Sequence, residues 1–347
     1  MSYLDAAKKR ATELISSKNA VILAIETSCD ETAAAVVKNG REALSNIIYT
    51  QIPLHRKFGG VVPELASRNH VDQIGLVVAA ALEEAGLDKG DIDAVAVTHG
   101  PGLVGALLVG VSFAKALAMS LNVPLIGVHH LMGHIAANYL TYPDLEPPFH
   151  CLIASGGHSD IVEVKDYTDF VHLGGTRDDA AGEAFDKVAR ALNLPYPGGP
   201  ELEKLAESGN PNAIAFHSAF NMGDSFDMSF SGLKTAAVNR LQSEPNVRPA
   251  DIAASFQFAV NSILSDKAIR AAKSTLALAG GVSANRNLRD MLEKKAGAKG
   301  VRFCCPDFKY CTDNAAMIGS AAYYLLMRGG LSDLSLNAVP ALEMQSS

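Results

Sequence analysis

The sequence lacks the features that would carry it into or across a membrane. No apolar run reaches the roughly 20 residues that span a bilayer, and the first twenty residues carry Lys8, Lys9 and Arg10 where a signal peptide has an apolar core. Hydrophobic residues make up 48% and charged residues 19% of the 347-residue chain, which is typical of compact globular proteins. We therefore expect a soluble cytoplasmic protein with no membrane segment, and its length favours two lobes.

Cysteine is scarce, and its spacing indicates neither a disulfide framework nor a cysteine-based metal site. The cysteines are Cys29, Cys151, Cys304, Cys305 and Cys311. We interpret them as free thiols in a reducing cytosol.

An excess of basic residues is also missing. Lys and Arg number 30 against 37 Asp and Glu, giving a formal charge of -7. Because phosphate neutralisation dominates nucleic-acid affinity, any such binding must come from local patches or from a partner subunit. The candidate patches, each of which is otherwise a solvated surface, are Arg56 with Lys57, and Arg286, Arg289, Lys294, Lys295, Lys299 and Arg302.

What the sequence does contain is a repeated strand–turn–strand–strand pattern. The first unit has strands at 20–26, 32–38 and 41–50, with a polar turn at 27–31 and an Asn39-Gly40 hairpin signal. The second has strands at 149–154, 160–165 and 169–173, with a turn at 155–159. Periodic helices alternating with short strands follow each unit. These helices are predicted at 69–85, 104–121, 180–192, 252–274, 287–295 and 314–327, and the strands at 94–98, 125–128, 276–279 and 301–304.

This pattern predicts two related α/β lobes with a ligand-binding cleft between them. We expect a short helical extension at 1–19, a first lobe at 20–131 to which residues 313–337 return, and a second lobe at 132–312.

Three segments have the composition of phosphate-binding turns, although each alone also suits an ordinary turn. Ser155-Gly156-Gly157 and Thr27-Ser28 occupy equivalent places in the two units. Ala279–Asn285 ends a strand and opens a helix, where Asn285 is a candidate to bind a ribose or base. A fourth segment, Pro197–Pro200, has a backbone able to approach a flat ligand closely.

The segment His129-His130-Leu131-Met132-Gly133-His134 spaces two imidazoles for one helical face, where they can share a metal. Asp313, where a loop enters a helix, is a candidate third ligand. A zinc peptidase would need glutamate at position 131, which is Leu131, so that mechanism lacks its base. Asp179, Glu183 and Asp186 line one side of a helix, either as a solvated acidic face or with Asp186 bonded to ligand hydroxyls.

Taken together, long motifs from about Val21 to Leu336 resemble the bacterial TsaD family, whose archaeal and eukaryotic relatives belong to the KEOPS complex. The motifs are IETSCDETAAAVV, FGGVVPELASRNH, THGPGLVGALLVG, GVHHLMGH, SGGHSDIVEV, DDAAGEAFDKVAR, YPGGPELEKLA, MSFSGLKTA, LAGGVSANRNLR and YCTDNAAMIG. The resemblance implies an actin-like ATPase (ASKHA) fold with two RNase H-like lobes.

The resemblance also implies an activity: transfer of threonylcarbamoyl from threonylcarbamoyl-AMP to N6 of the tRNA adenosine 3′ of the anticodon, which forms t6A and releases AMP. It implies an iron or zinc ion, an adenine nucleotide, tRNA as substrate, and TsaB and TsaE as partners. Matched by motif, the metal ligands would be His130, His134 and Asp313, and the acidic residues near the reacting centre Asp30 and Glu31. The adenylate would be held by Ile153, Ala154, Ser155, Gly156, Gly157, Asp186, Gly199 and Asn285.

Three features depart from the family pattern. Met132 stands where bacterial members usually carry glutamate, which leaves the ligands intact but changes their surroundings. The charged segment before Val21 is an extension, and the tail after Asn337 lacks the usual Arg-Pro-rich ending. The alternative function is a kinase-like or regulatory nucleotide-binding protein of the same fold, which would need no paired histidines.

Overall fold

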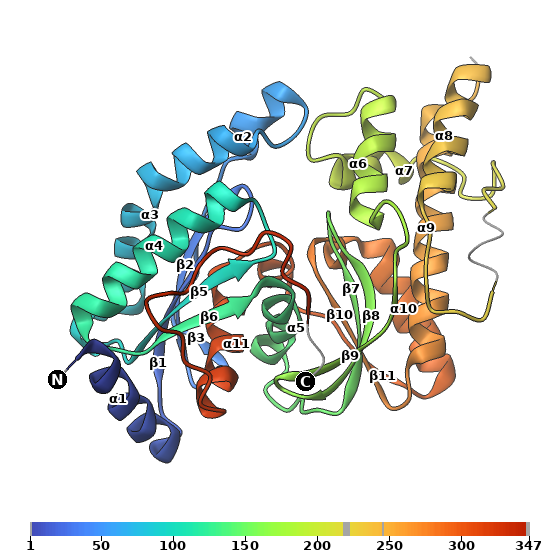
Figure 1. Ribbon diagram of the computed structural model, residues 1–347. Helices are drawn as coiled ribbons and strands as arrows, with labels where there is room; N and C mark the ends of the chain where they lie inside the picture. The colour runs from blue at the N-terminus through green and yellow to red at the C-terminus, as the bar shows by residue number, and fades with distance from the viewer. Residues whose placement is uncertain (1, 218–222, 245, 345–347) are drawn as a thin grey trace.

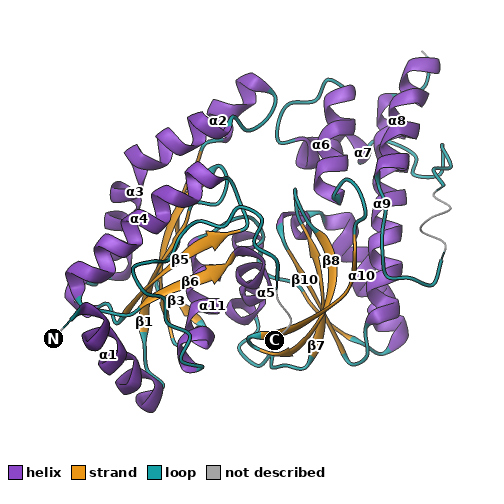
Figure 2. Ribbon diagram, in the orientation of Figure 1, coloured by secondary structure: helices purple, strands orange, loops and turns teal. Residues whose placement is uncertain are grey.

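The computed structural model describes residues 2–217, 223–244 and 246–344. Its strands form two sheets that stand side by side, each with helices on its faces (Figures 1 and 2).

The N-terminal sheet has the strand order β3-β2-β1-β5-β6, and β4 pairs with β2 outside this path. β1 and β2 are antiparallel, whereas β1, β5 and β6 run parallel. Their almost continuous apolar sequence suits a sheet covered on both faces. The strands are β1 (Val21–Glu26), β2 (Glu31–Lys38), β3 (Glu42–Ala43), β4 (Ile47–Thr50), β5 (Ala94–Gly100) and β6 (Leu125–His129).

The C-terminal sheet repeats this arrangement with the order β11-β10-β7-β8-β9. β7, β8 and β9 are antiparallel neighbours, and β10 and β11 extend the sheet in parallel from β7. The repeat predicted from the sequence is therefore confirmed, with the β1–β2 and β7–β8 turns in equivalent places. The strands are β7 (Phe149–Ala154), β8 (Ser159–Asp166), β9 (Asp169–Gly175), β10 (Thr275–Ala279) and β11 (Arg302–Cys304).

The helices form a middle layer and two outer layers (Figure 1). The α-helices are α1 (Tyr3–Ser17), α2 (Ile52–His55), α3 (Pro63–Ala85), α4 (Val104–Leu121), α5 (His130–Thr141), α6 (Ala181–Ala191), α7 (Gly198–Ala206), α8 (Ser231–Ser243), α9 (Pro249–Ala271), α10 (Arg286–Lys299) and α11 (Ala315–Met327). Short 3-10 helices are η1 (Arg56–Phe58), η2 (Lys89–Asp91), η4 (Gly281–Ala284) and η5 (Phe308–Tyr310).

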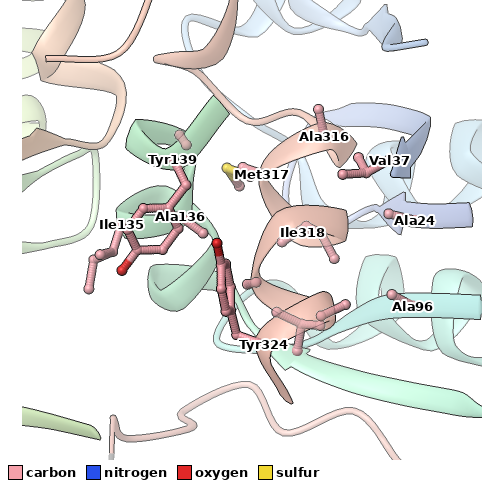
Figure 3. Packing of buried hydrophobic residues seen from close by; sticks show 14 of the residues in the cluster. Ala24, Val37, Ala96, Ile135, Ala136, Tyr139, Ala316, Met317, Ile318 and Tyr324 are labelled. Atoms are coloured by element: carbon pink, nitrogen blue, oxygen red, sulfur yellow. The ribbon is translucent and has the colours of Figure 1, made fainter. Parts of the chain in front are cut away.

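Helices α5 and α11 make the middle layer, and one apolar core joins them to both sheets. Figure 3 shows Ile318 of α11 between α5 and the strand that carries Ala24. Gly319 permits the close approach, because a Cβ atom there would lie 2.6 Å from Val37. α11 thus returns to the N-terminal sheet, and the predicted lobe boundary at residue 131 falls inside α5. The division of the chain into lobes at these residues stays a prediction.

The outer layers bury the other sheet faces. α3 and α4 share a core with β1, β2 and β5, and α6 to α10 share a core with the C-terminal sheet. α4 is long and apolar enough, by length and composition alone, to cross a membrane. Its buried residues Leu107, Val111 and Ala114 nevertheless form the face turned towards the sheet. We interpret α4 as a covering helix whose outer face remains apolar at Val104 and Leu108.

One local prediction was wrong. The strand expected at 41–50 is divided into β3 and β4, because Ser45 interrupts the ladder: its hydroxyl accepts the Val36 N–H at 3.0 Å. The helix expected within 1–19 is present as α1, which buries Ala7, Ala11 and Leu14. The Asn39-Gly40 hairpin prediction is confirmed, with both residues at positive φ.

Candidate metal centre and nucleotide cleft

Three side chains with metal-binding atoms meet where α5 begins. His130 and His134 lie one turn apart on α5, and Asp313 lies in the loop before α11. Asp313 Oδ1 lies 3.5 Å from His130 Nε2 and 3.3 Å from His134 Nε2. Ligand atoms of all three lie within 4.8 Å of one another. The predicted grouping of these side chains is therefore confirmed.

Burial and charge set the protonation of this group. Burial acts to lower the pKa of His130, but Asp313 and Glu26 raise it well above its usual value. Burial lowers the pKa of His134. Burial opposes ionisation of Asp313, yet His130 holds the pKa of Asp313 far below its usual range. The centre is thus an imidazolium ion between two carboxylates, and a divalent cation has to displace its proton.

Glu26, the last residue of β1, orients His130. Its carboxylate lies 3.1 Å from His130 Nδ1 and accepts the Thr98 hydroxyl at 2.6 Å. The Ser28 hydroxyl lies 3.3 Å from the same Nδ1 atom. Glu26 is fully buried, so its charge depends on these partners. The arrangement leaves His130 Nε2 facing Asp313, as a ligand requires.

The donor set fits a transition metal. Two imidazoles and one carboxylate are common ligands of zinc and iron. Among the described residues, buried His134 has no partner with hydrogen-bond geometry at either ring nitrogen; Nε2 has only the Asp313 carboxylate beside it, at 3.3 Å. A buried unpaired nitrogen is costly, and a metal–nitrogen bond would satisfy it. Met132, the departure from the family pattern, packs against the apolar core.

The two acidic candidates follow the β1–β2 turn. Asp30 is buried, and the Tyr196 hydroxyl donates to its Oδ2 at 3.5 Å. Glu31 accepts the Thr50 hydroxyl at 3.1 Å. Burial, together with the neighbouring charges of Asp30 and Asp313, raises the pKa of Glu31 to about 9. Glu31 therefore keeps its proton at neutral pH.

The β7–β8 turn has the open backbone expected of a phosphate-binding loop. Ser155 N donates to His158 O at 2.8 Å, and the His158 N–H donates to the Ser155 hydroxyl at 3.1 Å, which fixes the turn. A Cβ atom on Gly156 or Gly157 would meet nothing within 4 Å. Ile153 and Ala154 are fully buried in β7, so they support the turn from beneath.

The equivalent Thr27-Ser28 turn is closed. Thr27 is buried and its hydroxyl donates to Ala106 O at 2.9 Å. The Ser28 carbonyl accepts from Leu103 N at 2.8 Å, and its side chain faces His130. The first turn is therefore not open to a phosphate, because residues after β5 cover it. The prediction that both turns bind phosphate was wrong for this turn.

The glycine-rich segment after β10 approaches the β7–β8 turn. Gly280 has φ 86°, and a Cβ atom there would lie 2.5 Å from the Ala154 carbonyl, so only glycine fits. Gly281 faces open space. Asn285 caps α10 by accepting from Leu288 N at 2.9 Å, and it donates to the side-chain Oε1 of Gln257 at 2.9 Å. Its side chain thus has partners within the protein, and its contact with a ribose or base stays a prediction.

A cleft of about 280 Å³ separates Gly59, Gly60 and Val61 from the C-terminal half of the chain. Its opposite wall includes Gly156, Glu183, Asp186, Lys187, Arg190, Tyr196 and Gly198. Asp186 accepts from Gly198 N at 2.8 Å and Gly199 N at 3.2 Å, and burial raises the pKa of this carboxyl. Asp186 thus fixes the Pro197–Pro200 segment at the cleft. Asp179 lies apart, in ion pairs with Lys187 and Lys234.

Most of the expected C-terminal basic patch is committed to internal contacts. Lys295 pairs with Asp266 at 2.6 Å, and Arg302 pairs with Asp144 at 2.9 Å. Lys299 donates to carbonyls at the end of α9. Arg289 donates to the carbonyls of Ser283 and Pro306. These cations therefore stabilise the fold.

Sequence reasoning did not identify Glu26 and Tyr196 as site residues, and it placed Arg289 only in a candidate nucleic-acid patch. Glu26 had a visible signal, because it is a charged residue ending an otherwise apolar strand. Tyr196 and Arg289 had none, since their partners are backbone and side-chain atoms distant in sequence.

Comparison with known structures shows the actin-like ATPase fold that the sequence predicted. HypF from T. kodakarensis superposes with a TM-score of 0.61 and 16% identity, over 90% of this chain and 48% of that one. Component A of (R)-2-hydroxyglutaryl-CoA dehydratase from Acidaminococcus fermentans superposes with a TM-score of 0.56 and 17% identity, over 89% and 98%.

Sequence comparison is more specific. The family model described as TsaD, tRNA N6-adenosine threonylcarbamoyltransferase, matches residues 42–320. The tRNA N6-adenosine threonylcarbamoyltransferase of Clostridium perfringens is 56% identical over 93% of this chain and 98% of its own length. The protein of the same name from Clostridioides difficile is 55% identical over the same shares. The chain belongs to the TsaD family of tRNA N6-adenosine threonylcarbamoyltransferases.

Proposed function

We propose that this chain transfers the threonylcarbamoyl group of threonylcarbamoyl-AMP to N6 of the tRNA adenosine 3′ of the anticodon, and releases AMP. The observation that carries the proposal is the connection between the two halves of the site. Tyr196 lines the cleft and its hydroxyl donates to Asp30. The charge of Asp313 contributes to the raised pKa of Glu31, the residue next to Asp30. A nucleotide in the cleft therefore lies beside the metal-binding group, where an acyl transfer can use both.

Each half has a role that follows from its chemistry. A Cβ atom on Gly156, Gly157 or Gly281 would meet nothing within 4 Å, so a phosphate can approach the backbone of these segments, and backbone N–H groups in such turns bind phosphate. Asp186 holds Gly198 and Gly199 against the nucleotide. Because N6 of adenine is a weak nucleophile, rate comes from positioning and from charge stabilisation. Asp30 accepts the N6 proton, since Glu31 is already protonated.

His130, His134 and Asp313 would hold one divalent metal per subunit. When bound, iron or zinc supplies a Lewis acid that polarises an oxygen of the adenylate. We propose Fe²⁺ first, because a site of two imidazoles and one carboxylate is typical of non-haem iron, and zinc second. Metal analysis of the purified protein distinguishes the two. It also distinguishes the alternative function, since a kinase-like or regulatory protein of this fold needs no transition metal.

We propose TsaB and TsaE as protein partners in the cytoplasm. The outer faces of α3 and α4 expose Val71, Leu76 and Leu108, with exposed fractions of 62%, 65% and 41%. These side chains surround an apolar groove between the two helices. TsaB would cover this groove, and the acidic net charge explains why tRNA affinity depends on partners.

The function is tested by depleting the protein from cells and measuring threonylcarbamoyladenosine in tRNA by mass spectrometry. We expect the modification to disappear, to return with the wild-type gene, and to stay absent with His134→Ala. Return of the modification with His134→Ala would contradict the role of the metal centre. Unchanged modification in depleted cells would contradict the function itself.

A further inference from the structure

The exposed aromatic residue Phe58 follows two cations in the chain and precedes the glycines that line the cleft. The 3-10 helix η1 consists of Arg56, Lys57 and Phe58, and Gly59 ends it. All three side chains are exposed, and Phe58 is 59% exposed. We call these three residues the lip. The Phe58 ring is therefore available to contact a ligand that reaches this surface.

The lip is continuous with the site. Gly59 and Gly60, which follow it directly, line the cleft. Arg56 Nε donates to the Tyr196 carbonyl at 2.8 Å, across the cleft from its own sheet. The Tyr196 hydroxyl reaches Asp30. A single residue, Tyr196, therefore separates the lip from the proposed proton acceptor.

The lip also carries a positive charge, on Lys57, that no carboxylate of the described residues neutralises. Within the described part of the chain, Lys57 has no hydrogen bond or ion pair, unlike Lys295 and Arg302. Arg190, exposed on the opposite wall of the cleft, adds a third cation to Arg56 and Lys57. Cations beside an exposed aromatic ring are the combination that binds unpaired nucleic-acid bases: the charges contact phosphates and the ring stacks on a base.

We propose that the lip binds the anticodon loop of tRNA, with Phe58 stacked on an unpaired base next to the adenosine that enters the cleft. This inference rests on the proposed function, because it takes tRNA as the substrate. The inference adds the location of the bound RNA on the protein surface. An enzyme acting on a base must take that base out of its stack, and a ring at the cleft entrance replaces the lost stacking partner.

The chain contains no tryptophan, so Phe58→Trp introduces a single tryptophan, at the lip, whose fluorescence is excited selectively over that of the tyrosines. The full chain, alone and with its partner proteins, is titrated with an anticodon stem-loop RNA that carries the target adenosine. We expect the fluorescence of Phe58→Trp to be quenched, and its affinity to match that of wild type. The control is Phe258→Trp, which places the ring on the outer face of α9, where Phe258 is 41% exposed; it should show no quenching.

Two further variants separate stacking from charge. Phe58→Ala should weaken RNA binding by about fivefold to a hundredfold without changing its salt dependence. Lys57→Gln should lower the slope of log affinity against log salt by about 0.7 to 0.9. Neither should alter binding of adenine nucleotide or the melting temperature.

Several results would overturn the proposal. Equal quenching at position 258, or full RNA affinity in both Phe58→Ala and Lys57→Gln, would place the RNA elsewhere. Quenching by a partner protein without RNA would make the lip a protein interface, and loss of nucleotide binding in Phe58→Ala would make it part of the nucleotide site. In each case wild-type protein still modifies tRNA. If wild-type protein does not modify tRNA, the proposed function fails instead.

Discussion

The carboxylate of Glu26 lies 3.1 Å from Nδ1 of His130 and so determines which nitrogen of that ring is presented to Asp313. β1 ends at Glu26 and α5 begins at His130, so the centre of the N-terminal sheet positions the metal-binding group. Carboxylates that bond a ligand histidine orient its ring and increase its basicity.

Replacing Glu26 by glutamine should therefore weaken metal binding while keeping the fold. Glutamine has the same shape and can still accept the Thr98 hydroxyl, but it carries no charge. We expect metal affinity to fall by about 10-fold to 100-fold, measured by competition with a chromophoric chelator. A Thr98→Val variant, which removes a bond to Glu26 but keeps its charge, should lose less. Equal affinity in wild type and Glu26→Gln would contradict the orienting role.

His134 provides a separate test of the metal centre. In wild type, metal at about 100 times its dissociation constant should stabilise the fold by roughly 3 kcal/mol. His134→Ala removes one of the three donors, so metal should no longer raise its melting temperature. Differential scanning calorimetry with and without metal measures both. A metal-induced shift that persists in His134→Ala would mean that the ion binds elsewhere.

Much of the fold was predictable because periodicity and turn chemistry are local. The β7 prediction matches its observed bounds, and Asn39-Gly40 forms its hairpin. α7 and α8 were not predicted. α8 buries only Leu233 and Ala237 among its hydrophobic residues, so its sequence has little helical periodicity.

The candidate site was predictable where a motif carries its own geometry. The four-residue spacing of His130 and His134 needs only a helix to bring the two rings together. By contrast, Asn285 lies in a sequence segment that suits ligand binding. Its amide oxygen nevertheless caps α10, and its amide nitrogen donates to Gln257. Competition between ligand and internal partners depends on tertiary contacts, which one sequence does not display.

Two glycines near the cleft should respond oppositely to substitution. Gly157 faces open space and lies outside the left-handed region, so Gly157→Val should change the free energy of unfolding by less than about 1 kcal/mol. It should nevertheless weaken adenine-nucleotide binding at least tenfold, because its side chain blocks phosphate. Gly280→Ala should destabilise the fold by about 1–3 kcal/mol, through its positive φ and the Ala154 carbonyl. Calorimetric titration and chemical denaturation separate the two effects. Parallel loss of both properties in Gly157→Val would mean that its role is conformational.

Glu31 should make stability depend on pH in metal-free protein. Its pKa is about 9 in the folded protein against a usual value of 4.5, so the folded state binds the extra proton between these values. Stability contributed by the protonated carboxyl is complete below pH 4.5 and is lost as pH rises towards 9. Glu31→Gln has no proton to lose, so it should be more stable than wild type at pH 8 by up to about 5 kcal/mol, and the difference should shrink by pH 5. Urea unfolding at both pH values measures this. A constant difference would show that Glu31 is ionised in the folded protein.

Arg289 connects the nucleotide side of the site to the metal side. Its guanidinium donates to the Ser283 carbonyl beside the glycine-rich segment, and at 2.8 Å to both the Pro306 carbonyl and the Cys311 thiol, two residues before Asp313. Arg289→Gln leaves buried acceptors unpaired, which should cost about 2–4 kcal/mol of unfolding free energy. Because the loop that carries Asp313 loses its anchor, metal affinity should fall as well.

The matched control is Arg286→Gln. Both arginines lie over the Phe308 ring, at 4.0 Å for Arg289 and 5.8 Å for Arg286, but the described contacts of Arg286 include no side-chain hydrogen bond. Arg286→Gln should therefore stay within about 0.5 kcal/mol of wild type and keep its metal affinity. Chelator competition on the folded variants, below their melting temperatures, distinguishes positioning from simple stability. If Arg289→Gln loses stability but binds metal as tightly as wild type, the loop does not need this anchor to present Asp313.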